Sequence, residues 1–275
     1  MKKHYNFKNL IKSIISFFFS DQNGISTVRV LSGPAKGTVL YLDLKKESLY
    51  WIGTYDKWLL DKLRLENIIK PGWVAWDCGS YVGFYASVFR KLVGDGGYVY
   101  AFEASGENYA RLKNLPVLNK WDNLQIINEA VGPDHTTIQF VSNQGGASGP
   151  AELSKIFNNK NDLNIESVIS RGIDELVLEK NVLPPNIIKF DLETAEIFAL
   201  ANGDYVYSEI RPLILLELHG QDCLMAAATF LTRYNYTAQD IYFMNDKNKQ
   251  WYSRENKLSE ENYVPHMLYC KPLPL

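Results

Sequence analysis

Short apolar runs alternate with longer amphipathic stretches through the middle of this 275-residue chain. The short runs are rich in β-branched and aromatic residues, which is typical of buried strands, and the longer stretches carry apolar residues at helical spacing. The predicted strands are 73–78, 98–103, 124–129, 186–192 and 213–218, and the predicted helices are 81–92, 106–118, 195–202 and 221–232. This alternation predicts an α/β fold in which helices cover both faces of a mostly parallel sheet.

The first seventy residues follow a different pattern. Residues 27–30 and 38–42 are β-rich and flank the turn sequence SGPAKG, which predicts a β-hairpin. A helix is expected within 48–69. We therefore divide the chain into an N-terminal segment, 1–70, packed on the core, and one α/β domain, 71–275.

The first twenty residues predict an N-terminal helix. Apolar residues recur at helical spacing there, namely Leu10, Ile11, Ile14, Ile15 and Phe18. The uninterrupted apolar runs are far shorter than the ~20 residues that a membrane-spanning helix needs. Two interpretations stay open: the helix packs on the core or a partner subunit, or it lies on a membrane surface, for which lysine and phenylalanine are a typical composition.

Composition narrows the class of protein. The formal net charge of −2 gives no overall indication of nucleic-acid binding. Cys78, Cys223 and Cys270 are odd in number, lie far apart and lack CxxC spacing, so we expect neither a disulfide framework nor a zinc site. A reducing, cytoplasmic location is therefore expected, with membrane association through the N-terminal helix as the alternative.

The most specific pattern is the strand–helix–strand unit from WDCGSYVGFYAS to VYAFEAS. Asp77 ends the first strand, Glu103 ends the second, and Gly79 and Gly83 lie in the turn that precedes the helix. Ligands of parallel sheets bind at the carboxyl ends of the strands, and glycine permits a sharp turn and a close approach. The unit therefore predicts a binding site for a nucleoside-bearing cofactor.

The spacing D-x-G-x-x-x-G favours one cofactor. A dinucleotide needs backbone amides around its pyrophosphate and the pattern G-x-G-x-x-G, but Ser80, Tyr81 and Val82 occupy this turn. S-adenosylmethionine has no phosphate, its positive groups suit Asp77, and its ribose hydroxyls suit Glu103. S-adenosylmethionine is therefore the favoured cofactor. The alternatives are an NAD-dependent oxidoreductase of Rossmann type and a non-catalytic binding protein of this fold.

Two later strands end in groups suited to catalysis. Asp191 and Glu193 follow one strand, and Glu217 and His219 end the other, so we expect the four side chains to converge beside the cofactor. His219 is the leading candidate for a general base, because an ordinary pKa of ~6.5 suits proton removal near neutrality. A core histidine bonded to a carboxylate is the alternative. A divalent metal on these groups is possible but is not established by their spacing.

Further roles are expected for four neighbouring side chains. Lys189 lies in a strand buried on both faces, where an unpaired ammonium is costly, so we expect an ion pair with Glu217 as the candidate partner. Asp191 could alternatively bind the methionine part of the cofactor. Glu193 or Glu196 could hold the acceptor.

The motifs resemble, in order, those of the FkbM family of S-adenosylmethionine-dependent methyltransferases. The similar segments are WIGTYDKWLLDKL, WDCGSYVGFYAS, VYAFEAS, NEAVG, IIKFDLETAEIFALANG and LILLELHG, which together span roughly residues 50–220. The resemblance implies a Rossmann-like class I methyltransferase with a seven-stranded sheet whose last strand is antiparallel. It also implies methylation of a hydroxyl group on a sugar, a glycan or a secondary metabolite.

The resemblance also implies the site residues. The cofactor-binding residues would be Tyr55, Asp77, Gly79, Ser80, Tyr81, Gly83, Glu103, Ala104, Glu129, Ala130 and Asp191. The catalytic residues would be His219, Glu193 and Glu217. Thr194 stands where the family usually has glycine, so the turn after Glu193 is expected to differ. The expected partner is a small-molecule or glycan acceptor rather than a nucleic acid, and the oligomeric state is left open.

Overall fold

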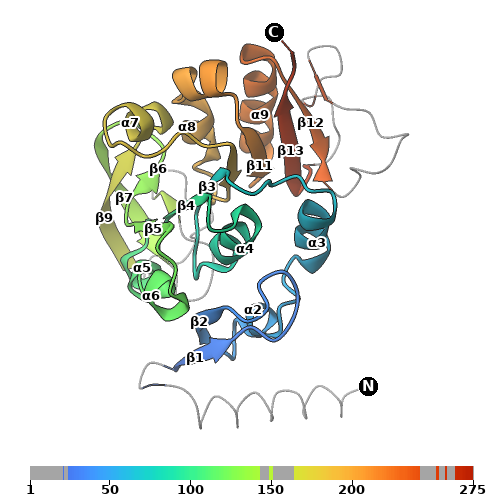
Figure 1. The fold of residues 1–275 in the computed structure, drawn as a ribbon. Coiled ribbons are helices and arrows are strands. Elements are labelled where there is room, and N and C mark those ends of the chain that lie inside the picture. The colour runs from blue at the N-terminus through green and yellow to red at the C-terminus, as the bar shows by residue number, and fades with distance from the viewer. Residues whose placement is uncertain are drawn as a thin grey trace, which may run out of the picture.

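A computed structural model describes residues 21, 24–142, 149–150, 164–241, 252–253, 258 and 264–274. Its central feature is a seven-stranded sheet in the order β12-β13-β11-β10-β3-β4-β5 (Figure 1). The strands are β3 (Val74–Cys78), β4 (Tyr98–Phe102), β5 (Leu124–Ile127), β10 (Ile187–Phe190), β11 (Leu213–Glu217), β12 (Tyr236–Asp240) and β13 (Met267–Pro272). Strand β13 is antiparallel to both neighbours, and β3, β4, β5, β10 and β11 pair in parallel. The expected class I methyltransferase sheet is confirmed.

Both faces of this sheet are buried, and the alternation of side chains along the strands explains how. Ala75 belongs to one buried apolar cluster and its neighbour Trp76 to the other, and Ile187 and Ile188 divide in the same way. Successive side chains of a strand point to opposite faces, so each face needs its own cover. Helices therefore lie on both sides of the sheet, as predicted (Figure 1).

The four predicted helices of the domain are present, one of them divided in two, and two further helical segments accompany them among the described residues. The helices are α4 (Phe84–Val93), α5 (Gly106–Leu112), α6 (Leu115–Asn119), α7 (Ile173–Leu178), α8 (Glu196–Ala201) and α9 (Gln221–Arg233), with a π-helical turn at Val206–Ile210. The single helix predicted at 106–118 is two helices. Pro116 lies in the first turn of α6, where its missing amide is tolerated, whereas inside one long helix it would remove a hydrogen bond.

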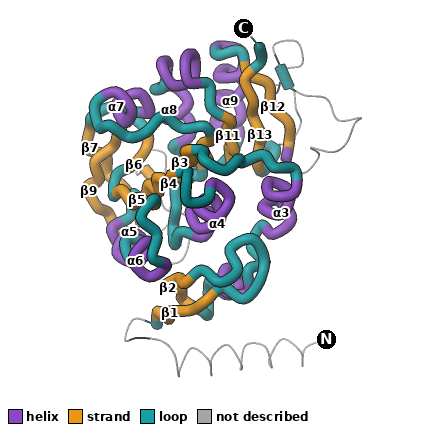
Figure 2. Tube along the Cα trace, viewed as in Figure 1, coloured by secondary structure: helices purple, strands orange, loops and turns teal. Residues whose placement is uncertain are grey.

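A second, smaller sheet was only partly predicted. It has the order β6-β9-β7-β8 and consists of β6 (Ala130–Val131), β7 (Thr136–Ser142), β8 (Gly149–Pro150) and β9 (Asn164–Arg171). Residues 136–142 alternate as a strand does, which the sequence alone reveals, but no sequence pattern identifies the strands that pair with them. Figure 2 shows this sheet beside the β5 end of the main sheet, where it can wall off the carboxyl ends of the parallel strands.

The N-terminal segment packs against the main domain. The predicted hairpin is confirmed as β1 (Ile25–Arg29) and β2 (Val39–Asp43), and α2 (Ser48–Ile52) and α3 (Lys57–Leu65) follow it. Leu42, Leu60 and Phe84 belong to one buried cluster, so this segment shares its core with α4. The helix expected in the first twenty residues lies outside the described part of the chain. Among the helices of the described part, none has the length and apolarity to cross a membrane.

Candidate active site

The carboxyl ends of β4, β3, β10 and β11 meet at one edge of the main sheet. In register, Phe102 pairs with Cys78, Cys78 with Phe190, and Phe190 with Leu216. The residues that follow these positions therefore lie side by side. The order in which the chain adds strands changes side at β3: β4 and β5 follow on one side of it, and β10 and β11 on the other. Ligands of open α/β sheets bind at such a switch point. A cavity of about 630 Å³ opens at this edge.

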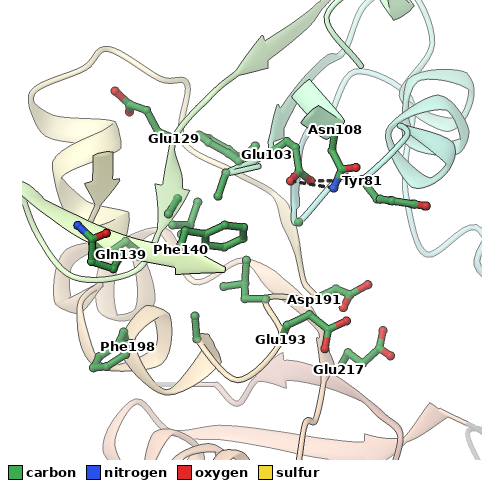
Figure 3. Close-up of a pocket in the computed structure, with 18 of the residues that line it drawn as sticks. Tyr81, Glu103, Asn108, Glu129, Gln139, Phe140, Asp191, Glu193, Phe198 and Glu217 are labelled. Atoms are coloured by element: carbon green, nitrogen blue, oxygen red, sulfur yellow. Dashed lines mark hydrogen bonds between the residues drawn. The ribbon is translucent and has the colours of Figure 1, made fainter. Parts of the chain in front are cut away.

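One end of the cavity is built around Glu103. Its side chain is buried, and its two carboxylate oxygens accept hydrogen bonds from the amides of Tyr81 (2.8 Å) and Ser105 (2.9 Å). Asn108 and Tyr81 lie beside it (Figure 3). Burial raises the pKa of Glu103 to about 7, although the hydrogen bonds from Ser105 and Tyr81 oppose the shift. The carboxylate is thus a fixed hydrogen-bond acceptor at the end of β4, which suits a pair of ribose hydroxyls.

The turn after β3 uses its own amides. Gly79 and Ser80 both donate to the carbonyl oxygen of Phe102, at 3.0 and 2.9 Å, and the next amide, that of Tyr81, is bonded to Glu103. Three successive N–H groups are therefore satisfied within the protein. A pyrophosphate would need such groups to be available, so this turn favours a cofactor that has no phosphate.

The two glycines of the turn are required for packing. Gly79 has φ +85°, and a Cβ there would collide with the carbonyl oxygen of Asp191 on the neighbouring strand end. Gly83 has φ +82°, and a Cβ there would lie 2.6 Å from the side chains of Leu112 and Leu115. Gly79 lines the cavity, whereas Gly83 lets α4 approach α5 and α6 and is not among the cavity-lining residues. The close approach that Gly83 permits is therefore between helices.

Asp77 is placed differently from the expectation of direct cofactor contact. Its side chain is fully buried, does not line the cavity, and has no hydrogen-bond partner among the described residues. Burial raises the pKa of Asp77, and the charge of Lys189, its register partner on β10, opposes the shift. Ser80 is also buried, and its hydroxyl donates to the backbone carbonyl of Asp77 at 2.7 Å. Both residues support the turn from behind.

The other end of the cavity is acidic. Asp191, Glu193 and Glu217 all line it (Figure 3). Lys189, which is 1% exposed, forms its ion pair with Asp191 at 2.9 Å, and its ammonium lies 4.6 Å from the ring centre of Tyr85. The expected ion pair therefore exists, but Asp191 rather than Glu217 supplies the partner.

His219 lies among these carboxylates. Its Nδ1 is hydrogen-bonded to Glu196 at 2.9 Å, and its Nε2 lies 3.6 Å from Glu193, 3.7 Å from Asp191 and 3.9 Å from Glu217. The structure thus brings the four expected side chains together. Burial alone would lower the pKa of His219, but the hydrogen bond to Glu196 and the surrounding carboxylates outweigh it and raise the pKa to about 9. His219 is therefore protonated at neutral pH, and the premise that it titrates near 6.5 does not hold.

Glu196, one of the two residues expected to be able to hold the acceptor, does not face the cavity. Its side chain is fully buried at the start of α8. Besides His219, it accepts a hydrogen bond from the amide of Leu192 at 2.6 Å. Glu196 is therefore a positioning residue that fixes the orientation of the imidazole and of the turn after β10.

That turn has an unusual backbone. Glu193 and Thr194 both have positive φ, +50° and +83°. Positive φ is uncommon for residues with a side chain and is a clear outlier for a β-branched residue such as threonine. The family's usual glycine would adopt this conformation without strain. The turn nevertheless directs Glu193 into the cavity.

The remaining predicted cofactor residues, Tyr55, Ala104, Glu129 and Ala130, also line the cavity. Glu129 forms an ion pair with Arg171 at 3.3 Å. The aromatic ring of Tyr55 lies 4.3 Å from that of Tyr50, measured between ring centres. Other cavity residues were not anticipated from the sequence: Tyr50, Asn108, Gln139, Phe140 and Phe198. They come from α2, α5, β7 and α8. Phe198 lies within the segment IIKFDLETAEIFALANG and Tyr50 directly precedes the segment WIGTYDKWLLDKL, but the other three lie outside the family-like segments.

Comparison with known proteins assigns the family. Residues 77–249 match the model of the methyltransferase FkbM domain, which is more than half of the chain. No curated protein sequence matches the chain.

Solved structures with a related arrangement include three methyltransferases. An FkbM methyltransferase from Methylobacillus flagellatus is 16% identical, over 64% of this chain and 46% of its own, with a TM-score of 0.39. An S-adenosylmethionine-dependent O-methyltransferase from Thermotoga maritima is 10% identical, over 82% and 67%, with a TM-score of 0.43. Fibrillarin from Aeropyrum pernix, crystallised with bound S-adenosylmethionine, is 11% identical, over 77% and 73%, with a TM-score of 0.41.

These scores are too low to support an inference about substrate. The assignment therefore rests on the family match, which begins at Asp77 and includes the strand ends that surround the cavity. The chain belongs to the FkbM family of S-adenosylmethionine-dependent methyltransferases.

Proposed function

We propose that this protein transfers the methyl group of S-adenosylmethionine to a hydroxyl group of a sugar, a glycan or a secondary metabolite. The observation that carries the proposal is the single cavity that joins Glu103 to the acidic end at Asp191, Glu193 and Glu217. A cofactor and an acceptor can meet in one such space, which is the geometry that a direct group transfer requires.

The Glu103 end fits the nucleoside half of the cofactor. Glu103 would accept hydrogen bonds from the ribose hydroxyls, and Ala104, Glu129 and Ala130 extend the wall beyond β4 and β5. Gly79 and Asp191 line the same cavity, and the methionine half would fit along them toward Glu193 and Glu217. The aromatic rings of Tyr50, Tyr55 and Tyr81 line the same stretch, and such rings are suited to a positively charged sulfonium.

The acidic end fits the reaction centre. S-adenosylmethionine supplies an electrophilic methyl group, so the protein must orient an acceptor oxygen behind it and remove the hydroxyl proton. Glu193 and Glu217 face the cavity and are the groups proposed to receive that proton. His219 lies next to both, and its positive charge in this arrangement would stabilise the carboxylates rather than take the proton.

The proposal also includes the division into domains, the location of the protein and the class of its partner. Residues 71–275 would form the methyltransferase domain and 1–70 an appended segment, consistent with the shared core of the hairpin and α4. The protein would work in the cytoplasm, with contact to a membrane or a second subunit through its first twenty residues. The partner would be a small-molecule or glycan acceptor rather than a nucleic acid.

The decisive experiment measures release of S-adenosylhomocysteine from the full chain with a panel of acceptors. Sugars, glycans and hydroxylated secondary metabolites form one arm, and amines and thiols form the other. Mass spectrometry and NMR of the product then locate the new methyl group. A methyl ether supports the proposal, whereas a product methylated only on nitrogen or sulfur would reject the choice of a hydroxyl acceptor.

A further inference from the structure

We propose that Asp191, Glu217 and His219 form a binding site for a divalent cation such as Mn²⁺ or Mg²⁺ at the acidic end of the cavity. One possible ligand atom from each residue lies within 4.8 Å of those of the other two. The three residues follow or end the adjacent strands β10 and β11, so the sheet itself sets their spacing. Two carboxylates and one neutral imidazole are a ligand set that first-row divalent cations accept. Without a cation His219 is protonated, so binding of the cation at Nε2 would displace the Nε2 proton into solvent.

The orientation of His219 is the first argument. Its Nδ1 is held at 2.9 Å by Glu196, a fully buried carboxylate, and its Nε2 is therefore directed toward Asp191 and Glu217. A histidine that binds a metal through one nitrogen is commonly fixed by a carboxylate or carbonyl at the other nitrogen. Glu196 supplies this support without facing the cavity itself.

The distances are the second argument. Nε2 lies 3.7 Å from Asp191 and 3.9 Å from Glu217, which is beyond hydrogen-bonding distance. Two ligands bonded to one cation at about 2.1 Å are about 3.0 to 3.4 Å apart for tetrahedral or octahedral angles. The observed separations are slightly longer than that, so a cation could be accommodated by small side-chain movements.

The balance of charge is the third argument. Asp191 has Lys189 as its partner, but the ion-pair contacts described for Glu193 are with His219 alone, and those for Glu217 are with His219 and His266. Three carboxylates thus surround the imidazole of His219, with Lys189 beside Asp191 and His266 beside Glu217 as the other basic groups. Like charges held close together at low dielectric are costly, and a divalent cation would offset that cost.

The consequence for catalysis rests on the proposed function. Asp191 and Glu217 line the cavity, so a cation between them could be reached by an acceptor hydroxyl. Coordination of a hydroxyl oxygen to a divalent cation lowers its pKa. Its proton could then pass to Glu193, which lines the same wall but is not one of the three ligands.

The test is a titration of the full chain with Mn²⁺, without cofactor or acceptor, in which electron paramagnetic resonance reports free Mn²⁺. We expect one saturable site per chain, with Mg²⁺ as a competitor. Glu217→Gln and His219→Gln should each weaken Mn²⁺ binding at least about tenfold, and Glu196→Gln by about 10- to 100-fold through loss of ligand orientation. Glu209→Gln, which removes an exposed carboxylate that does not line the cavity, should bind Mn²⁺ as the wild type does.

Circular dichroism and thermal melting of each variant, with Glu217→Gln as the most conservative change, separate loss of the site from loss of the fold. Absence of saturable Mn²⁺ binding by the wild type would overturn the cation site, and so would wild-type binding by folded Glu217→Gln and His219→Gln. A parallel titration with S-adenosylmethionine distinguishes the two proposals. Cofactor binding without Mn²⁺ binding rejects only the cation site, and Mn²⁺ binding without cofactor binding rejects only the proposed function.

Discussion

At the scale of single residues, Glu103 is the group whose protonation should control cofactor binding. Burial raises the pKa of Glu103 to about 7, so the carboxyl is largely protonated below that pH and offers less acceptor capacity to the ribose. The affinity for S-adenosylmethionine should therefore rise between about pH 6 and pH 8 and level off above that range. Calorimetry across this range measures the effect.

Two variants test whether Glu103 is the titrating group. Glu103→Gln should bind the cofactor about tenfold more weakly and lose the pH dependence, because a neutral amide accepts fewer hydrogen bonds. Glu107→Gln, an exposed neighbour on α5, should keep the wild-type profile. A flat profile in the wild type would show that the Glu103 carboxyl does not limit binding.

Thr194 is a second residue with a testable consequence. A threonine at φ +83° is strained, and glycine adopts this conformation freely. Thr194→Gly should raise the free energy of unfolding by about 1 kcal/mol, since relief of backbone strain exceeds the extra entropy of an unfolded glycine. Urea denaturation measures the change.

The matched control for Thr194→Gly lies inside a helix. Thr229 is an exposed position in α9, where the same substitution should lower stability by about 1 kcal/mol because of the low helix propensity of glycine. If both substitutions destabilise the protein to a similar extent, the turn after β10 is not strained by its threonine.

At the scale of elements, Glu47 and Arg111 connect three parts of the molecule. Glu47 immediately precedes α2, and its side chain is buried. Its carboxylate contacts the guanidinium of Arg111 on α5 and the hydroxyl of Tyr81 in the turn after β3. Arg111 also donates to the carbonyl oxygen of Tyr41 on β2 at 3.0 Å. These contacts link the N-terminal hairpin to the turn after β3, in which the amide of Tyr81 donates a hydrogen bond to Glu103. Disruption of this network should therefore weaken cofactor binding.

Arg111→Met tests this connection. It leaves the buried carboxylate of Glu47 without its cation, a change that typically costs about 3–5 kcal/mol, and we expect weaker S-adenosylmethionine binding as well. Arg64→Met removes a largely exposed ion pair with Asp61 and should change both quantities little. Chemical denaturation and calorimetry measure stability and affinity. Equal effects of the two substitutions would argue against a special role for the buried pair.

At the scale of the whole molecule, the turn at the carboxyl edge of the main sheet restricts which cofactor can bind there. The turn amides of Gly79, Ser80 and Tyr81 are already bonded within the protein, so no pyrophosphate cradle exists there. S-adenosylmethionine and S-adenosylhomocysteine should raise the melting temperature, in line with about 2.7 kcal/mol of stabilisation at a hundredfold excess over Kd. NADH at the same concentration should leave it unchanged, and stabilisation by NADH alone would contradict the cofactor assignment.

Local sequence patterns were sufficient to predict the class of fold and the position of the turn after β3. Strand and helix periodicity are local, so 73–78 and 98–103 could be recognised as strands that end in Asp77 and Glu103. The parallel arrangement then followed, because the strands alternate with helices and the carboxyl ends of parallel strands share one edge. The convergence of Asp191 and Glu217 could be anticipated for the same reason.

The burial and the contact partners of the site residues became known from the three-dimensional structure. Asp77 is buried behind the cavity, Lys189 pairs with Asp191, and Glu196 on α8 fixes the imidazole of His219. The cavity is also lined by residues of α2 and β7, which are far apart in the chain. Burial, pKa and contact partners depend on how distant elements pack, and local periodicity carries no information about that packing.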